Sequence, residues 1–332
     1  MIQGGTVPPG LVTIPLGIDA LGTSRWNLLK FNEPLRRVDN PYNWPVPVIT
    51  PQTVDDALIA LADAPVHRLL AGGTDEMVKL NHGGQLRQFE TVISLSRIAE
   101  LSTWTIDPAR RNLTIGAAVS WSQLIEEPFV SHVPVLAQAA RTVGSPQIRN
   151  AGTIGGNVAT ASPAGDGLCA LVALDAVATV RSTRGERRVR VAELATGPKR
   201  TDLEPDELIV SLDVPLTRGF QGYTKVGVRN AMVISLAGVA LVVDDEAQSV
   251  RFALGSVGPT ILRSPAAEDI AADILFGAQR RDDAMARVVA AIRDTARPID
   301  DHRSTAAYRR HAVGVLASRL IERALISRGV DR

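Results

Sequence analysis

Two glycine-containing turns have the residue types to bind an anion through the backbone. The first is AGGTD at residues 71–75, and the second lies within NAGTIGGNVATASPAGD, residues 150–166, which holds no charged side chain before Asp166. Backbone N–H groups that no side chain shields can hold a phosphate at the start of a helix. A tight turn before a closely packed helix would explain the same glycines, so the spacing leaves both interpretations open.

The first turn differs from the common nucleotide motifs. AGGTD lacks the lysine of a P-loop and the GxGxxG spacing of a Rossmann domain. The sequence therefore supports neither an ATPase nor a Rossmann dinucleotide domain.

Local patterns predict the elements that position these turns. Residues 50–63 predict an amphipathic helix with Thr53 as its N-cap and four apolar residues on one face, Val54, Ala57, Leu58 and Leu61. The other elements expected before residue 150 are a strand at 66–71, a helix at 76–80, a strand at 91–96, a hairpin at 103–119, a helix at 121–127 capped by Ser120, and a small-residue helix at 134–145. The last of these leads directly into the second turn.

Beyond Asp166 the pattern changes to strands followed by helices. The expected elements are an apolar segment at 168–182, a hairpin around 184–186, a strand at 207–214, antiparallel strands between 223 and 263, and three amphipathic helices between 266 and 328. The linker PLTRGFQG at 215–222 predicts a domain boundary.

Charge and cysteine content exclude several kinds of partner and site. The chain has 36 basic and 35 acidic residues in 332, so no global field attracts a polyanion and nucleic acid is not an expected partner. The single cysteine, Cys169, excludes an intrachain disulfide and a cysteine-ligated iron–sulfur or zinc site built from this chain alone. We expect no metal site, and we expect Cys169 to be a small buried hydrophobe.

Targeting and membrane signals are weak. No apolar run approaches the roughly 20 residues that span a bilayer, and the N-terminus has no basic residue before its apolar part. We therefore expect a cytoplasmic protein without membrane insertion. Only four lysines occur among the 36 basic residues, which makes each one worth locating: Lys30, Lys79, Lys199 and Lys225.

Three sequence blocks together resemble the FAD-binding subunit of the molybdenum hydroxylases. They are AGGTD at 71–75, QIRNAGTIGGNVATASPAGD at 147–166 and YTKVGVRNAM at 223–232. This family includes the medium subunit of carbon monoxide dehydrogenase and the flavin subunit or domain of xanthine dehydrogenase and aldehyde oxidoreductases. The resemblance covers about residues 46–330, and three blocks in order are more specific than any single glycine motif.

The resemblance implies an α+β fold. It predicts a two-subdomain FAD-binding domain of the vanillyl-alcohol oxidase/MurB type at residues 46–220, with subdomains at about 46–105 and 106–220. A C-terminal domain of antiparallel sheet plus helices would follow at 221–332. Residues 1–45 would form an extension that the family lacks, irregular or packed on another surface, and its aromatic residues suggest docking: Trp26, Phe31, Tyr42 and Trp44.

The resemblance also implies which residues hold FAD. The two turns would clamp its diphosphate from two sides, with Asp166 accepting hydrogen bonds from the ribityl or flavin region, Lys225 near the isoalloxazine ring, and Leu208 or Ile209 against the flavin. The implied cofactor-binding residues are Ala71, Gly72, Gly73, Thr74, Asp75, Thr153, Ile154, Gly155, Gly156, Asn157, Asp166, Leu208, Ile209 and Lys225. No residue is expected to act as a catalytic acid or base.

Some residues of these blocks have a structural role as the alternative. Asp166 could cap the helix that follows it, and Lys225 could be a surface charge at the start of a strand. Ser162 and Pro163 could shape the turn without touching FAD, and Arg149 could order the glycine loop or an interface.

The implied function is electron transfer. In this family a large molybdenum-cofactor subunit oxidises the substrate, [2Fe–2S] clusters on a small iron–sulfur subunit relay electrons, and FAD passes them to NAD, a quinone or dioxygen. This chain would perform the last stage, in a dimer of heterotrimers. A stand-alone flavoenzyme that has lost these partners, and a protein-binding module with an inactive flavin site, are the competing hypotheses.

Overall fold

The computed structural model describes residues 11–18, 24–30, 47–64, 66–81, 91–277 and 281–329. The chain divides into two units, Met1–Pro45 and Val46–Arg332. The first unit contains β1 (Leu11–Ile18) and β2 (Ser24–Lys30), paired antiparallel with Leu11 opposite Lys30. The prediction of irregular structure is therefore wrong for these two segments, and the alternative, that the extension packs on another surface, stays a prediction. Of the aromatic residues expected to dock, Trp26 lies in β2, and Phe31, Tyr42 and Trp44 lie outside the described residues.

A small parallel sheet begins the second unit. Its strands have the order β3 (Val48–Ile49), β5 (Thr91–Ser94) and β4 (His67–Leu70). Helix α1 (Val54–Asp63) connects β3 to β4. The predicted N-cap is confirmed, because Thr53 Oγ1 accepts a hydrogen bond from Asp56 N at 3.1 Å. The predicted apolar face is confirmed too, since all four of its residues are buried: Val54, Ala57, Leu58 and Leu61.

A five-stranded antiparallel sheet follows, in the order β6-β7-β12-β8-β9. The strands are β6 (Trp104–Asp107), β7 (Asn112–Gly116), β8 (Val177–Ser182), β9 (Gly185–Arg190) and β12 (Leu208–Pro215). Both predicted hairpins are present as β6–β7 and β8–β9. Strands β10 (Ala195–Gly197) and β11 (Arg200–Thr201) form a separate short pair.

Short helices and 3₁₀ turns connect these strands. They are α2 (Glu76–Asn81), η2 (Ala99–Ser102), η3 (Gln123–Ile125), α3 (Phe129–His132), α4 (Pro134–Thr142), α5 (Pro146–Ala151), α6 (Ile154–Thr160), α7 (Asp166–Ala173) and α8 (Val191–Leu194). Helix α4 matches the predicted small-residue helix, with Leu136, Ala139 and Ala140 buried. The second glycine turn thus begins after α5 and forms the N-cap and first turn of α6.

The predicted helix at 121–127 is wrong, because only the 3₁₀ turn η3 forms there. Trp121 N donates to Gly152 O and Ser122 N donates to Arg149 O, so the segment pairs with the second glycine region. Pro128 also has no N–H with which to continue a helix. Tertiary pairing with α5 therefore outweighs the local helical pattern.

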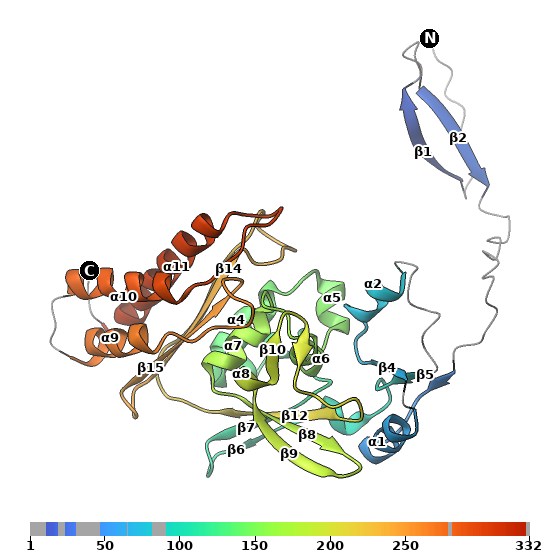
Figure 1. The fold of residues 1–332 in the computed structure, drawn as a ribbon, viewed down its shortest axis with the longest axis horizontal. Coiled ribbons are helices and arrows are strands. Elements are labelled where there is room, and N and C mark those ends of the chain that lie inside the picture. The colour runs from blue at the N-terminus through green and yellow to red at the C-terminus, as the bar shows by residue number, and fades with distance from the viewer. Residues whose placement is uncertain are drawn as a thin grey trace. The chain divides into compact units, whose positions relative to one another are not determined.

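The C-terminal part builds a three-stranded antiparallel sheet that is covered on both faces. Its strands are β13 (Gln221–Val226), β14 (Ala237–Asp244) and β15 (Ser249–Gly255), and its helices are α9 (Pro265–Phe276), α10 (Arg281–Thr295) and α11 (Ala306–Ser327). In Figure 1 these three helices lie together beside the sheet. Successive β14 residues alternate between two cores: Val239 and Leu241 pack with the C-terminal helices, and Ala240 and Val242 pack with α4 and α7.

The predicted domain boundary near residue 220 stays a prediction. Residues 216–220 join β12 to β13 without helix or strand. However, one hydrophobic core contains Leu113 and Leu212 together with Tyr223 and Ala240, so buried contacts cross that point. Among the described residues, no helix is both long and apolar enough to cross a bilayer.

Candidate functional site

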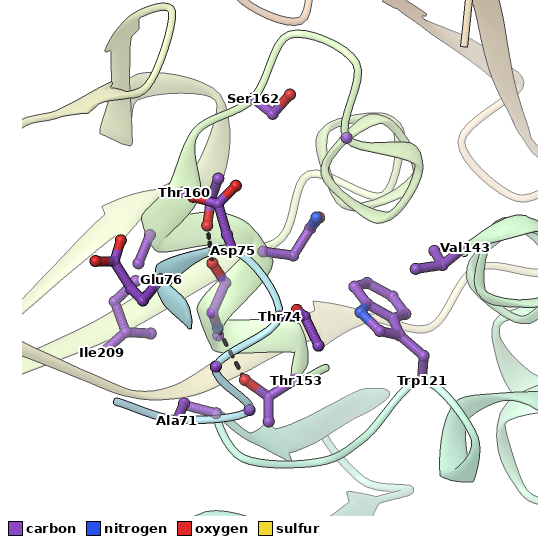
Figure 2. Close-up of a pocket in the computed structure, with 18 of the residues that line it drawn as sticks. Ala71, Thr74, Asp75, Glu76, Trp121, Val143, Thr153, Thr160, Ser162 and Ile209 are labelled. Atoms are coloured by element: carbon purple, nitrogen blue, oxygen red, sulfur yellow. Dashed lines mark hydrogen bonds between the residues drawn. The ribbon is translucent and has the colours of Figure 1, made fainter. Parts of the chain in front are cut away.

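A cavity of about 510 Å³ lies between the two glycine turns. This volume falls in the range of ligand and cofactor sites. Figure 2 shows Glu76 and Ile209 at one end of the cavity and Trp121 and Val143 at the other, with Ala71 and Thr153 at its base. Twelve of the fourteen predicted residues line it: Ala71, Gly72, Gly73, Thr74, Asp75, Thr153, Gly155, Gly156, Asn157, Asp166, Leu208 and Ile209. The other two, Ile154 and Lys225, are not among the lining residues.

The first turn is held close to the second by its glycines. A Cβ on Gly72 would lie 1.8 Å from Ala151 O, so only glycine allows this approach between the two backbones. Gly73 has φ 69°, a left-handed conformation that glycine adopts at little cost. Among the described residues, the N–H groups of Gly72, Gly73 and Thr74 donate to no backbone carbonyl. These donors are available to a ligand in the cavity.

The second turn uses its N–H groups within the protein. Ile154 N donates to Val119 O at 3.0 Å, and Gly155 N donates to Ala117 O at 2.8 Å. Thr153 is the N-cap of α6, and its Oγ1 accepts from Gly156 N at 3.1 Å, which is one of the dashed lines in Figure 2. The resemblance implied that N–H groups of both turns hold the diphosphate. Among the described residues, the first turn has backbone donors without a backbone partner, whereas the N–H groups of residues 154–156 are already paired.

The second turn instead offers open space and an amide side chain. A Cβ on Gly156 would meet only Thr153 Oγ1, at 2.8 Å, whereas a Cβ on Gly155 would lie 2.5 Å from the Cβ of Ala117. Gly155 is thus explained by close packing, and Gly156 by the cavity. Asn157 Oδ1 is buried and has no hydrogen-bond partner in the described part of the chain. A buried orphan acceptor beside a cavity fits a bound ligand with hydroxyl or N–H donors.

These features together fit a dinucleotide such as FAD. The first turn supplies unpaired N–H groups for a diphosphate, and Asn157 supplies an unpaired acceptor for a donor such as a ribose hydroxyl. Apolar side chains line other parts of the wall, including Leu208, Ile209 and Trp121. Trp121 was not predicted, and its indole packs on α7 so closely that a Cβ on Gly167 would lie 2.0 Å from the ring.

Asp166 is the centre of a buried polar network at one end of the cavity. Its Oδ1 accepts hydrogen bonds from Tyr223 Oη and Ser235 Oγ, each at 2.7 Å. Its Oδ2 accepts from Lys225 Nζ at 2.5 Å and from Thr142 Oγ1 at 3.0 Å. Each carboxylate oxygen of Asp166 thus already accepts two hydrogen bonds from the protein. The predicted contact of Asp166 with the ribityl or flavin region stays a prediction, because neither oxygen is left without a protein donor.

Asp166 does not cap a helix and Lys225 is not a surface charge, so neither structural alternative from the sequence accounts for these contacts. Asp166 begins α7, but the N-cap is Gly165 and no side chain caps the helix. The Lys225 side chain is only 10% exposed, so it is not a surface charge. Besides Asp166, its Nζ donates to Thr142 O at 3.0 Å and to Val233 O at 3.1 Å. Lys225 therefore holds the 233–234 segment, which lines the cavity, in place.

Tyr223 makes the network sensitive to alkaline pH. Burial, and then the charge of Asp166, raise the pKa of Tyr223 well above its ordinary value of 10.0. Above that pH the unfolded tyrosine loses its proton while the folded one keeps it, so the free energy of unfolding should fall as pH rises. Urea midpoints measured between about pH 9 and 11 should show this fall. The decrease of the urea midpoint with pH should be shallower in Tyr223→Phe than in wild type or in the half-exposed control Tyr308→Phe. Equal slopes in all three proteins would contradict the assignment.

Two lysines that the sequence analysis gave no role meet at Asp75. Lys79 Nζ lies 3.0 Å from Asp75 Oδ2, and Lys199 Nζ lies 3.3 Å from Asp75 Oδ1. Burial opposes ionisation of Asp75, but hydrogen bonds and charge from Lys79 and Lys199 outweigh it and hold the pKa of Asp75 below its usual value. All three residues line the cavity. The scarcity of lysine in the chain was the only sequence signal that could have singled them out.

The backbone conformation of Lys199 is unfavourable for a residue other than glycine. Its φ is 56°, in the left-handed region that costs a non-glycine residue roughly 1–2 kcal/mol. Its side chain is 56% exposed and that of Asp75 is 37% exposed, and ion pairs of this kind contribute only about 0.2–1 kcal/mol. The ion pair therefore does not offset the backbone cost.

The expectations for Cys169 and Arg149 are confirmed. Cys169 is a free, buried thiol that donates to Ala253 O at 3.2 Å, and burial raises its pKa. Arg149 orders the glycine loop by donating to Val143 O and Gly144 O, each at 3.1 Å. Within the described ranges, no group of three or more His, Cys, Asp or Glu side chains is placed to hold a metal ion.

Comparisons with known proteins agree with this site. Residues 40–217 match the family model of the FAD binding domain in molybdopterin dehydrogenase, and residues 223–324 match that of the CO dehydrogenase flavoprotein C-terminal domain. The chain is 31% identical to a putative xanthine dehydrogenase FAD-binding subunit of Escherichia coli over 284 residues, covering 83% of this chain and 95% of that protein. It is 32% identical to the carbon monoxide dehydrogenase medium chain of Hydrogenophaga pseudoflava, covering 82% and 95%.

A solved structure supports the same assignment. Carbon monoxide dehydrogenase from Hydrogenophaga pseudoflava, in a form lacking the Mo-pyranopterin moiety, superposes with a TM-score of 0.77 at 29% identity, covering 85% of this chain and 98% of that one. The predicted α+β fold, an FAD-binding domain followed by a C-terminal domain, is confirmed. The chain belongs to the family of FAD-binding subunits of the molybdenum hydroxylases, and it is an oxidoreductase subunit.

Proposed function

We propose that this chain receives electrons from the [2Fe–2S] clusters of a small partner subunit and passes them to NAD, a quinone or dioxygen. A large molybdenum-cofactor subunit would supply the electrons by oxidising the substrate. The relatives are named as subunits or chains of xanthine, nicotinate and carbon monoxide dehydrogenases, which supports a role within such an assembly. A dimer of heterotrimers is the assembly that the family resemblance favours.

The cavity between the glycine turns carries this proposal. When bound there, FAD supplies the conversion between one-electron and two-electron transfer. Gly72, Gly73 and Thr74 would bind its diphosphate through N–H groups that make no other backbone bond in the described chain. Asn157 would accept from one of its hydroxyl or N–H donors, and the side chains of Leu208 and Ile209 would pack against it and exclude water.

The remaining predicted residues would act through the protein. Thr153 fixes the first turn of α6, and Ile154, which is fully buried, anchors that helix in the core. Lys225 holds Val233 through its carbonyl oxygen. Cys169 is buried, and it is the only cysteine in the chain, so the iron–sulfur clusters must come from another subunit. A cytoplasmic location accords with that single reduced thiol.

Purification of the native complex tests the proposal. The chain should elute with two other subunits in one peak that contains flavin, iron and molybdenum, with the flavin lost on denaturation of this chain. A colourless chain that takes up no FAD would overturn the FAD role. Flavin without iron or molybdenum would instead favour the stand-alone flavoenzyme. That candidate stays open because the family match begins only at residue 40, so the residues before it are extra.

A further inference from the structure

The turn between β10 and β11 places a lysine where the backbone favours glycine. Lys199 adopts φ 56°, and its N–H donates to Ala161 O at 3.0 Å. Ala161 is the C-cap of α6 and is itself left-handed, with φ 48°. The turn is therefore fixed to the far end of the helix whose first turn borders the cavity.

The Lys199 side chain reaches from this turn to the opposite wall. Its ammonium pairs with Asp75, which directly follows the first glycine turn and lies 124 residues away in sequence. Both residues line the cavity, and both are partly exposed. The pair thus bridges the two walls at a solvent-accessible edge, while Lys79 holds the other oxygen of Asp75.

Folding does not account for a lysine here. An ion pair this exposed contributes less than the left-handed conformation costs, so glycine at 199 would make the more stable chain. Strain kept beside a cavity points to a role in what the cavity binds. An ammonium group also has three donors, and Asp75 is the one acceptor recorded for it among the described residues.

We propose that Lys199 and Asp75 form a latch that closes the edge of the cavity and slows the release of a bound dinucleotide. The positive charge of Lys199 would also favour an anionic diphosphate held by residues 72–74, which line the same cavity. This inference rests on the proposed FAD site and adds to it a residue that controls how long the cofactor stays bound.

Lys199→Gly separates the latch from any structural role. The variant removes both the charge and the backbone strain, so the thermal midpoint should be unchanged or higher. In the full-length chain with its co-purifying subunits, FAD release followed by flavin fluorescence after dilution should become about fivefold faster, the most that a pair of this exposure supplies. The difference from wild type should shrink at high salt, because ions screen an exposed pair.

Gln248→Gly is the matched control. Gln248 lies exposed in the β14–β15 turn with φ 47° and does not line the cavity, so the change relieves similar strain without touching the latch. Its release rate should equal that of wild type. Asp75→Asn, which breaks the latch from the other wall, should also release FAD faster, and slower release would overturn the latch in favour of Lys199 acting alone.

Two results separate the latch from the function beneath it. If the wild-type protein retains FAD and Lys199→Gly releases it at the wild-type rate in low salt, the latch is wrong and the proposed function is unaffected. Wild-type protein that binds no FAD overturns the proposed function and the latch together.

Discussion

Gly72→Ala is expected to lower the free energy of unfolding by about 3 kcal/mol and to abolish FAD binding. The added methyl would lie 1.8 Å from Ala151 O, 2.6 Å from its carbonyl carbon and 2.9 Å from Gly152 Cα. All three are backbone atoms, so no side-chain rotation relieves the clash. Urea unfolding and flavin absorbance of the purified chain measure the two effects.

The two effects share one cause in the structure. Gly72 lets the first turn approach the end of α5, and this approach positions residues 72–74, whose N–H groups donate to no backbone carbonyl in the described chain, along the cavity wall. To accommodate a methyl, the two backbones must move apart by more than 1 Å, judged against the roughly 3.5–4.0 Å of normal contact. The donors then leave the positions in which they could hold a diphosphate together.

Gly156→Ala is the control for this prediction. Its methyl would meet only Thr153 Oγ1, a side-chain atom, and would otherwise enter the cavity. We therefore expect a chain that folds with near wild-type stability but binds FAD more weakly. If Gly72→Ala were as stable as Gly156→Ala, the close approach of the two backbones would not be what glycine provides at position 72.

The contrast between these glycines shows what the sequence could and could not predict. The position of both turns, the strand before the first and the small-residue helix before the second all followed from local patterns. The reason for each glycine did not, because it depends on which backbone lies opposite. Gly155 packs on Ala117, and Gly156 faces the cavity, although the two are adjacent and look alike in the sequence.

Tertiary partners explain the other differences. The 121–127 segment has a helical pattern, but the N–H groups of its first two residues donate to residues 149 and 152. Asp166 was recognised as important from its motif, but its four donors come from α4, β13 and the segment before β14, so its buried network was invisible to sequence reasoning. Lys199 belongs to no motif, and although lysine is scarce in the chain, only its backbone conformation and its contact with Asp75 give it a role.

Lys225→Met is expected to lower the free energy of unfolding by about 3–5 kcal/mol, because it leaves the Asp166 carboxylate buried without its cation. The Asp166 and Lys225 side chains are 7% and 10% exposed, so water cannot replace the lost partner. Lys199→Met is the matched control, since it removes the same group from an exposed pair and should cost no more than about 1 kcal/mol. Urea unfolding of both variants measures the difference, and equal losses would contradict a buried ion pair at Asp166.

The double variant Asp166→Asn with Lys225→Met tests the charge argument further. Removing both charges should recover part of the loss, because an uncompensated buried charge costs more than a neutral amide with hydrogen-bond partners. FAD binding should not recover with it. Lys225 donates to Val233 O, and methionine cannot, so the 233–234 segment that lines the cavity loses its anchor in either variant. A double variant that regains stability but still binds FAD weakly would separate the two roles of Lys225, neutralising Asp166 and positioning the wall of the flavin site.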